Sequence, residues 1–238
     1  MKRLIALCFG LVLACSDDLP DDSTLSSYLD ANEIVIDNVI ACAASNQNDS
    51  LVSVFLYPRP GVTNIQYFEA FGDDSQKNDF EAYERKALPL LDVFNGFLKK
   101  FEVTITEEKW VIVSFEEDEK VHLSNPIRIK NSSKPTEYIA TNVSVESNTI
   151  NPLITWEDGL YDDTKIYFQV ITDADDTLIS GTYTFDKFFR FYELENVVLN
   201  ITPDTPDDLK PNVTYGFTLL AVSEDNWVNL FSVKNFTP

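Results

Sequence analysis

One stretch decides how the second half of the chain folds: Leu209-Lys210-Pro211-Asn212-Val213-Thr214-Tyr215. Its proline and asparagine are typical of a turn. The tyrosine opens an apolar alternation that continues through Phe217, Leu219 and Ala221. A period of two places every second side chain on one face of a β-strand. The stretch therefore predicts a turn that leads into a half-buried strand.

The sequence upstream of this turn supplies further strands. Residues 138–145 and 152–156 read as two strands, the second with Trp156 near its end, and residues 166–171 alternate with period two. Together with the turn, this order resembles the fibronectin type III module over about residues 135–238. The resemblance implies that Trp156 is the core tryptophan of the second strand and that Tyr215 forms a tyrosine corner. The long aromatic middle, residues 178–201, departs from the module.

The first half of the chain is a series of short apolar runs separated by polar turns. We expect strands at residues 34–44, 51–57, 65–71, 99–105, 110–115 and 121–129. One short helix is expected at residues 78–88, where apolar side chains share a helical face and Pro89 follows. Six or seven strands with one short helix indicate a sandwich of immunoglobulin-like size.

A polar segment without periodicity, residues 130–135, separates the two halves. We therefore predict an all-β chain of two tandem β-sandwich domains behind a signal peptide and a short linker. The expected divisions are a signal peptide at residues 1–14, an acidic tether at 15–30, an immunoglobulin-like sandwich at 31–132 and a fibronectin type III-like sandwich at 133–238.

The chain begins like an exported protein. Lys2 and Arg3 precede ten apolar residues, which are too few to span a bilayer but suit a secretory leader. The run Val12-Leu13-Ala14-Cys15 resembles the lipobox of bacterial lipoproteins, although Val12 stands where that family prefers leucine. The resemblance implies cleavage before Cys15 and lipidation of its sulfur. Several acyl chains make attachment to a membrane durable.

Residues 15–22 are acidic and contain one proline, which fits a solvated tether. Their Cys-Ser-Asp-Asp start resembles the export signal of Bacteroidetes surface lipoproteins. It implies that the chain is lipid-anchored in the outer membrane and faces the cell exterior, with the membrane as its first partner.

The net charge of −21 at pH 7 limits the partners of the chain. Like charges repel, so nucleic acid and other polyanions are disfavoured, while a neutral glycan or a protein partner fits.

The sequence marks no catalytic constellation. His122 is the single histidine, and Cys42, in an apolar run, is the single thiol beyond Cys15, so we expect neither a metal nor another cofactor. The acidic runs 116–119 and 173–176 read as solvated turns. Calcium at residues 173–176 stays an alternative, although the spacing of an EF-hand loop is missing.

Asp225, Asn226 and Trp227 form the candidate ligand-binding group, because a tryptophan in a loop beside amide and carboxylate groups suits a sugar. The alternative interpretation is that Trp227 caps the core. We expect a lipid-anchored surface protein that serves binding or adhesion without catalysis, with a glycan as a candidate ligand. The alternatives are a surface hydrolase that cleaves polysaccharide through acidic residues and a structural subunit of an envelope complex.

Overall fold

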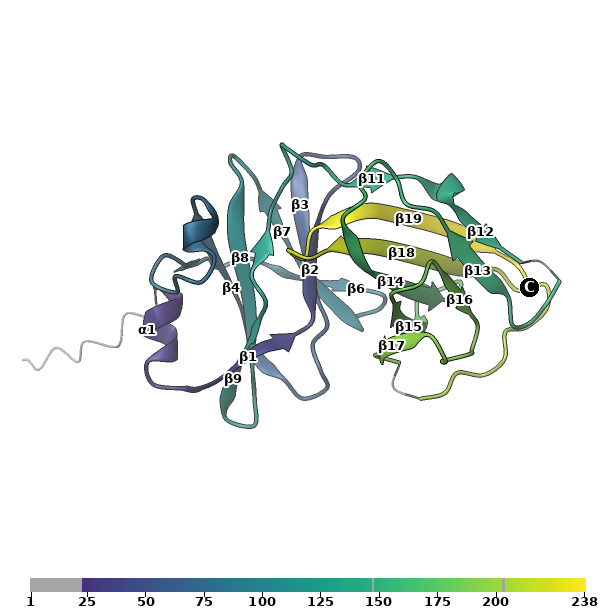
Figure 1. Cartoon of the computed structure of the whole chain (residues 1–238). Helices are drawn as coiled ribbons and strands as arrows, with labels where there is room; N and C mark the ends of the chain where they lie inside the picture. Colours follow the sequence, from purple (N-terminus) through teal and green to yellow (C-terminus); the bar gives the residue numbers. More distant parts are fainter. Residues whose placement is uncertain (1–22, 147, 203) are drawn as a thin grey trace, which may run out of the picture.

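The computed structural model describes residues 23–146, 148–202 and 204–238 and shows two β-sandwiches in tandem (Figure 1). The predicted all-β fold class is confirmed. Four sheets divide the strands of the described residues between the two sandwiches. The leader, Cys15 and the start of the expected tether lie outside the described residues.

The first sandwich consists of two sheets. Sheet A has the order β1-β9-β8-β4-β5, with β10 added to β8, and sheet B has the order β2-β3-β7-β6. Strands β2, β3, β7 and β6 opposite β4, β8 and β9 reproduce the immunoglobulin constant-type arrangement. The bounds are β1 (Glu33–Val39), β2 (Ala41–Ser45), β3 (Leu51–Leu56), β4 (Thr63–Phe71), β5 (Glu84–Arg85), β6 (Leu90–Val93), β7 (Leu98–Thr104), β8 (Lys109–Glu117), β9 (Lys120–Ser124) and β10 (Ile127–Arg128).

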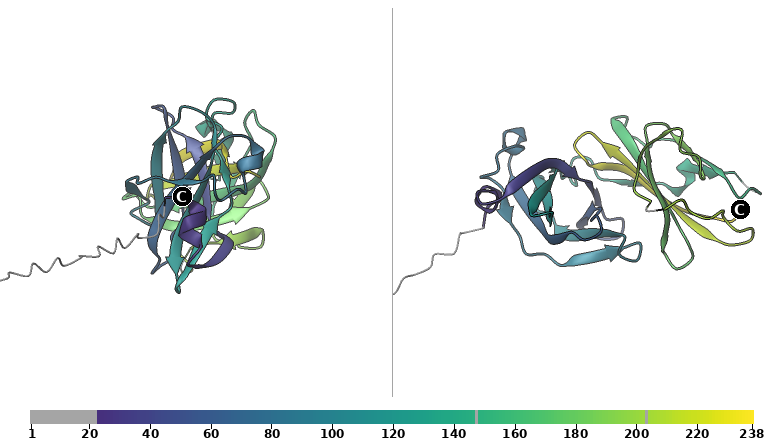
Figure 2. Two further views of the ribbon diagram at one scale, coloured as in Figure 1. Left: turned by 90° about the vertical axis from the view of Figure 1, so that its left-hand side faces the viewer. Right: turned by 90° about the horizontal axis from the view of Figure 1, so that it is seen from below.

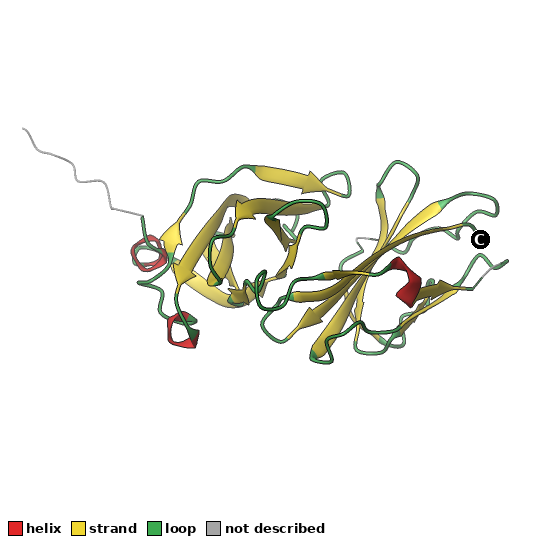
Figure 3. Cartoon of the chain, turned by 90° about the horizontal axis from the view of Figure 1, so that it is seen from above, coloured by secondary structure: helices red, strands yellow, loops and turns green. Residues whose placement is uncertain are grey.

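The second sandwich also consists of two sheets. Strands, drawn in yellow in Figure 3, make up most of it. Sheet C has the order β11-β19-β18-β14-β15-β17, and the smaller sheet D has the order β12-β13-β16. The bounds are β11 (Glu137–Tyr138), β12 (Val143–Val145), β13 (Leu153–Trp156), β14 (Thr164–Thr172), β15 (Leu178–Thr184), β16 (Phe188–Arg190), β17 (Val197–Asn200), β18 (Tyr215–Ser223) and β19 (Val228–Phe236).

The tyrosine corner forms as the sequence predicts. The hydroxyl of Tyr215, at the start of β18, accepts a hydrogen bond from the backbone N–H of Lys210 at 2.9 Å. Trp156 on β13 is buried in the same core as Phe217 and Leu219. The second sandwich is thus fibronectin type III-like. It departs from the fibronectin type III module within residues 178–201, as the sequence does. There β16 pairs with β13, and the chain then returns to pair β17 with β15.

The expected strand at residues 34–44 is two strands in different sheets. β1 pairs in parallel with β9 of sheet A, and β2 pairs with β3 of sheet B. A register shift between Val35 and Val39, with a positive φ of 57° at Asp37, bends the chain from one sheet to the other.

The expected helix at residues 78–88 is wrong, and so is the expected tether over residues 25–29. The helix α1 (Leu25–Leu29) instead packs on the outer face of sheet A, where Leu25 and Tyr28 are buried. The backbone carbonyls of Phe80 and Tyr83 accept hydrogen bonds from the N–H groups at the start of α1. This tertiary pairing overrides the helical periodicity of residues 78–88. Two short 3-10 turns, η1 (Asp74–Gln76) and η2 (Ala140–Asn142), complete the helical elements of the described chain.

The two sandwiches are joined by more than the connecting segment. The turn between β18 and β19 reaches into the first sandwich, where Trp227 is 0% exposed and packs in the core with Val54, Tyr67 and Phe115. The N–H of Ala43 donates to the carbonyl of Asn226 at 3.0 Å, so this turn also adds to the edge of β2. A ring covalently part of the second sandwich thus completes the core of the first.

A second set of bonds lies beside this turn. The N–H of Ser45 donates to Thr136 Oγ1 at 3.0 Å, and the hydroxyl of Thr136 donates to the carbonyl of Val228 at 2.8 Å. The hydroxyl of Tyr138 donates to the carbonyl of Ser45 at 2.6 Å. Three segments distant in sequence are therefore fixed to one another at the end of β2.

We expect Trp227→Ala to destabilise the first sandwich and to uncouple its unfolding from that of the second. Removal of a fully buried tryptophan costs about 3–5 kcal/mol, and the loss falls on the core of the first sandwich and on its attachment to the second. Calorimetry should show one transition for the wild-type protein and two for the variant, the first of them at a lower temperature. Val233→Ala, at a β19 residue that is 53% exposed, is the matched control and should change little. A single transition at the original temperature would contradict the role of Trp227.

Candidate functional site

A cleft of about 510 Å³ lies between the two sandwiches. One wall is the outer face of sheet B, with Cys42 on β2 and Phe55 on β3; the other is the outer face of sheet C, with Phe168 on β14, Tyr183 on β15 and Phe231 on β19. In Figure 2, the view from below shows the two sandwiches side by side, so these two sheet faces meet near the middle of the molecule. We call this space the interdomain cleft.

Strand alternation places these side chains in the interdomain cleft. On β3, Val52 and Val54 point into the core of the first sandwich, whereas Phe55 points the other way. On β14, Tyr167 belongs to the core of the second sandwich and Phe168 to the apolar cluster between the sandwiches. Both strands are thus apolar on both faces, as expected for sheets buried on two sides.

Aromatic rings form much of the walls. Phe168 and Tyr183 stack with ring centroids 4.4 Å apart, and the rings of Phe55 and Phe231 approach each other from opposite sandwiches at 6.3 Å. Tyr57 stacks on Phe97 at 5.5 Å on the first-sandwich side. Rings supply a large apolar contact area and lose little conformational freedom, which suits a binding surface.

Two ionisable groups on the apolar walls of the interdomain cleft, Cys42 and Tyr183, are uncharged near neutral pH. Burial raises the pKa of the Cys42 thiol to about 12. Burial, and to a smaller extent the charge of Cys42, raises the pKa of the Tyr183 hydroxyl well above its ordinary value. The neutral thiol is a poor nucleophile. The walls therefore favour neutral, apolar groups over charged ones.

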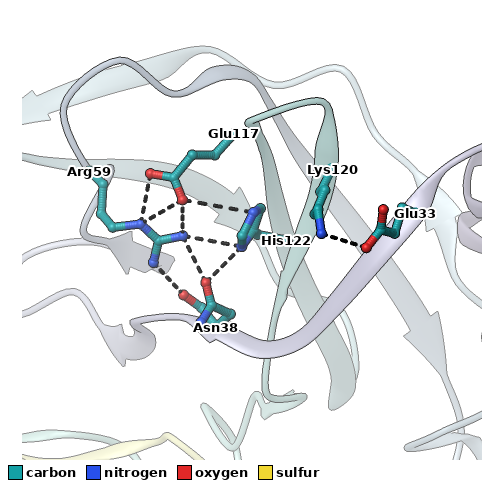
Figure 4. A network of polar contacts seen from close by, with 6 residues as sticks. All are labelled: Glu33, Asn38, Arg59, Glu117, Lys120 and His122. Carbon is teal, nitrogen blue, oxygen red and sulfur yellow. Dashed lines mark hydrogen bonds and ion pairs between the residues drawn. The ribbon is translucent and has the colours of Figure 1, made fainter.

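One end of the interdomain cleft carries a polar network, which Figure 4 shows from close by. The guanidinium of Arg59 donates to Glu117 through Nε at 3.0 Å and Nη2 at 2.6 Å, and to the carbonyl of Asn38 at 2.8 Å. It also lies over the ring of Phe115, with 4.8 Å to the centroid. The positive charge of Arg59 is thus already paired, and the guanidinium lowers the pKa of Glu117 through their hydrogen bonds.

His122 belongs to this network. Its ring is largely buried, stacks on Phe115 at 5.6 Å and lies with Nδ1 2.7 Å from Asn38 Oδ1. It therefore has the environment of a hydrogen-bonded structural histidine. Lys120 and Glu33 form a separate ion pair nearby.

The structure corrects the predicted ligand-binding group. The ring of Trp227 is buried and its Nε1 donates to the carbonyl of Lys134 at 2.7 Å, so it cannot stack on a sugar. Asp225 pairs with Lys130 and accepts from the hydroxyl of Ser223 at 2.6 Å. Only Asn226 of the three lines the interdomain cleft. The alternative interpretation of Trp227, as a residue that caps a core, describes it better, although the core is that of the other sandwich.

The two acidic runs differ in structure. Glu116 accepts from the hydroxyl of Tyr28 at 2.8 Å and Glu117 binds Arg59, so this run contributes to the fold as well as to a turn. Asp173 accepts from the N–H groups of Asp175 and Thr177, which closes the turn between β14 and β15. Across the described residues, no three His, Cys, Asp or Glu side chains cluster as metal ligands would.

The sequence analysis missed the interdomain cleft, because its residues come from strands that are far apart in the chain. One signal was present. Residues 54–57 and 166–168 are apolar at consecutive positions, a pattern typical of strands that are covered on both faces.

No family model matches the chain, and no curated protein matches its sequence. Solved structures match its shape. A two fibronectin type III domain segment from chicken tenascin is 11% identical at a TM-score of 0.34, covering 85% of this chain and 98% of that one. The BSP domain of a biofilm associated protein is 12% identical at a TM-score of 0.28, covering 84% and 29%. The glycoside hydrolase domain Endo-D from Streptococcus pneumoniae R6 is 10% identical at a TM-score of 0.35, covering 84% and 36%. Likeness at this level carries no information on ligand or activity.

We expect the Cys42 thiol to react slowly while the chain is folded. Thiolates are the reactive form, and a pKa of about 12 leaves a very small ionised fraction at pH 8. The test is the rate of reaction with a disulfide reagent such as DTNB, with Cys8→Ser and Cys15→Ser leaving Cys42 as the single thiol. Urea should accelerate the reaction to the rate of a free cysteine. Fast reaction of the folded chain would show that the thiol is not shielded.

Proposed function

We propose that this chain is a non-catalytic, lipid-anchored binding protein of the outer membrane surface, and that the interdomain cleft is its ligand site. One observation carries the binding role: a cleft of about 510 Å³, walled by aromatic rings, lies between two sandwiches that are locked together. Small-molecule sites occupy about 300–1,000 Å³, are mostly apolar and often lie at domain interfaces.

The lock between the sandwiches supports a preformed site. Trp227 and the bonds of Thr136 fix the walls before a ligand arrives. Binding then costs little ordering of the protein, which favours affinity.

The lack of catalysis is proposed on chemical grounds. The apolar part of the interdomain cleft has a neutral thiol and a neutral phenol; at its polar end the guanidinium of Arg59 is paired and the carboxylate of Asp37 is exposed to solvent. Such groups bind and orient a ligand, but none of them is poised as a base or nucleophile.

The proposed anchor rests on the leader and on Cys15. The part of the chain that the structure describes holds no helix with the length and apolar character to cross a membrane. Figure 1 places α1, where the described chain begins, at the end of the first sandwich that faces away from the second. A tether that enters there leaves the interdomain cleft clear of the membrane.

We expect Cys15→Ala to release the protein from the membrane fraction, because the sulfur that would carry the lipid is lost. Fractionation of cells followed by mass spectrometry of the amino terminus measures the change. Cys42→Ala is the matched control and should leave the protein with the membrane. An unmodified Cys15 in the wild-type protein would overturn the anchor and leave the ligand site untouched.

We expect a neutral apolar dye, N-phenyl-1-naphthylamine, to bind the folded protein with increased fluorescence. Cys42→Phe should weaken this binding at least about tenfold, because the larger ring fills the space that the dye needs. Leu199→Trp is a second variant, at a cleft-lining residue that is 41% exposed and thus tolerant of size. Melting temperatures check that both variants fold.

The control variant is Val233→Phe, which adds a ring outside the interdomain cleft. If Cys42→Phe and Leu199→Trp leave dye binding unchanged, as the control does, the dye binds elsewhere. Turnover of a polysaccharide by the wild-type protein would instead favour the hydrolase alternative.

A further inference from the structure

The two ends of the interdomain cleft differ in chemistry. At one end lie the amide side chains of Asn38, Asn125 and Asn226, beside the paired Arg59. At the other end lie Phe94 and Leu199. The cleft thus has an amide end and an apolar end.

The order of the strands separates these two ends. In sheet B, β2 lies at one edge and β6 at the other; Asn226 bonds to β2, whereas Phe94 directly follows β6. Asn226 lies in the turn before β19, which is close to one edge of sheet C. Leu199 lies on β17, at the opposite edge of this sheet. Both walls therefore run from polar to apolar in the same direction.

The amide end offers hydrogen bonds but no unpaired positive charge. Asparagine amides both donate and accept hydrogen bonds. Asn38 Oδ1 already accepts from Arg59 at 2.8 Å and Asn226 Nδ2 donates to the carbonyl of Pro126 at 3.4 Å, so the exposed amide of Asn125 is the main group for a ligand. Arg59, the cation of this end, already binds Glu117 and Asn38. Asp37 is exposed at the same end, and the whole chain carries −21 charges. An anionic group is therefore disfavoured here, whereas a hydroxyl or an amide is accommodated.

Away from the amide end, the described residues that line the cleft include no charged side chain. Phe55, Phe168 and Phe231 supply apolar surface along its length, and Cys42 and Tyr183 are neutral. Burial of a charge among such groups is costly.

We propose that the interdomain cleft binds an elongated, uncharged amphiphile, with its hydroxyl or amide head at the amide end and its apolar chain directed toward β6 and β17. This inference rests on the proposed function, because it names the class of ligand that the proposed site takes. It adds a charge preference and an orientation, which can be tested separately.

The test of charge compares three ligands that share a twelve-carbon chain: 1-dodecanol, dodecanoate and dodecyltrimethylammonium. Each is titrated against the full-length protein with bound N-phenyl-1-naphthylamine, the alcohol below its solubility limit and the two charged ligands below the concentration at which they form micelles. Dodecanol should displace the dye at a concentration at least about tenfold lower than either charged ligand, because a charged head loses solvation at the amide end. Equal or better displacement by a charged ligand would overturn the proposal, as would displacement by maltotriose, which has no apolar chain.

The test of orientation uses two variants at opposite ends. Asn125→Asp places a charge at an exposed position of the amide end and should shift preference toward the cationic ligand, with Asn125→Gln as the uncharged control. Leu199→Trp shortens the apolar end and should weaken dodecanol several-fold more than 1-octanol, which leaves that end empty. If Leu199→Trp weakens both alcohols equally, the proposed orientation is wrong.

The two levels of the proposal fail in different ways. If the wild-type protein does not bind the dye, the proposed ligand site is wrong. If the dye binds but none of the three twelve-carbon ligands displaces it, the proposed site stands and only the proposed class of ligand is wrong.

Discussion

The insertion of Trp227 into the first sandwich is the contact on which the arrangement of this molecule depends. The side chain extends from a turn of the second sandwich into the core between sheets A and B. Because the turn also pairs with Ala43 on β2, the ring cannot leave without breaking the edge of sheet B. This turn, together with the bonds of Thr136 and Tyr138 to Ser45, holds the outer faces of sheets B and C opposite each other.

From that constraint follows an arrangement of four sheets in layers. Sheets A and B enclose one core, sheets C and D enclose another, and a third apolar cluster lies between B and C. The strands of B and C run in clearly different directions in Figure 1, so two twisted faces meet over part of their area only. Where they diverge, Phe55 and Tyr183 stay partly exposed and the cleft remains.

Period-two patterns predicted most strands and the fold class, because burial on one face leaves a direct trace in the sequence. The same patterns say nothing about which sheet a strand joins. The segment at residues 34–44 therefore read as one strand, although it serves two sheets. Trp227 was placed correctly at the turn, yet its partner core belongs to residues at least 98 positions away. The interdomain cleft was not predictable for the same reason, since Cys42 and Tyr183 come together only after both sandwiches have formed.

The bonds of Thr136 and Tyr138 to Ser45, together with the buried turn at Trp227, have a consequence for the peptide between the sandwiches. Residues 132 and 133 are exposed, as a protease would require. Cleavage there would cut the backbone but leave intact the contacts of Trp227, Thr136 and Tyr138 with the first sandwich. Covalent continuity is thus redundant at this point, and a nicked molecule would remain one particle until it unfolds.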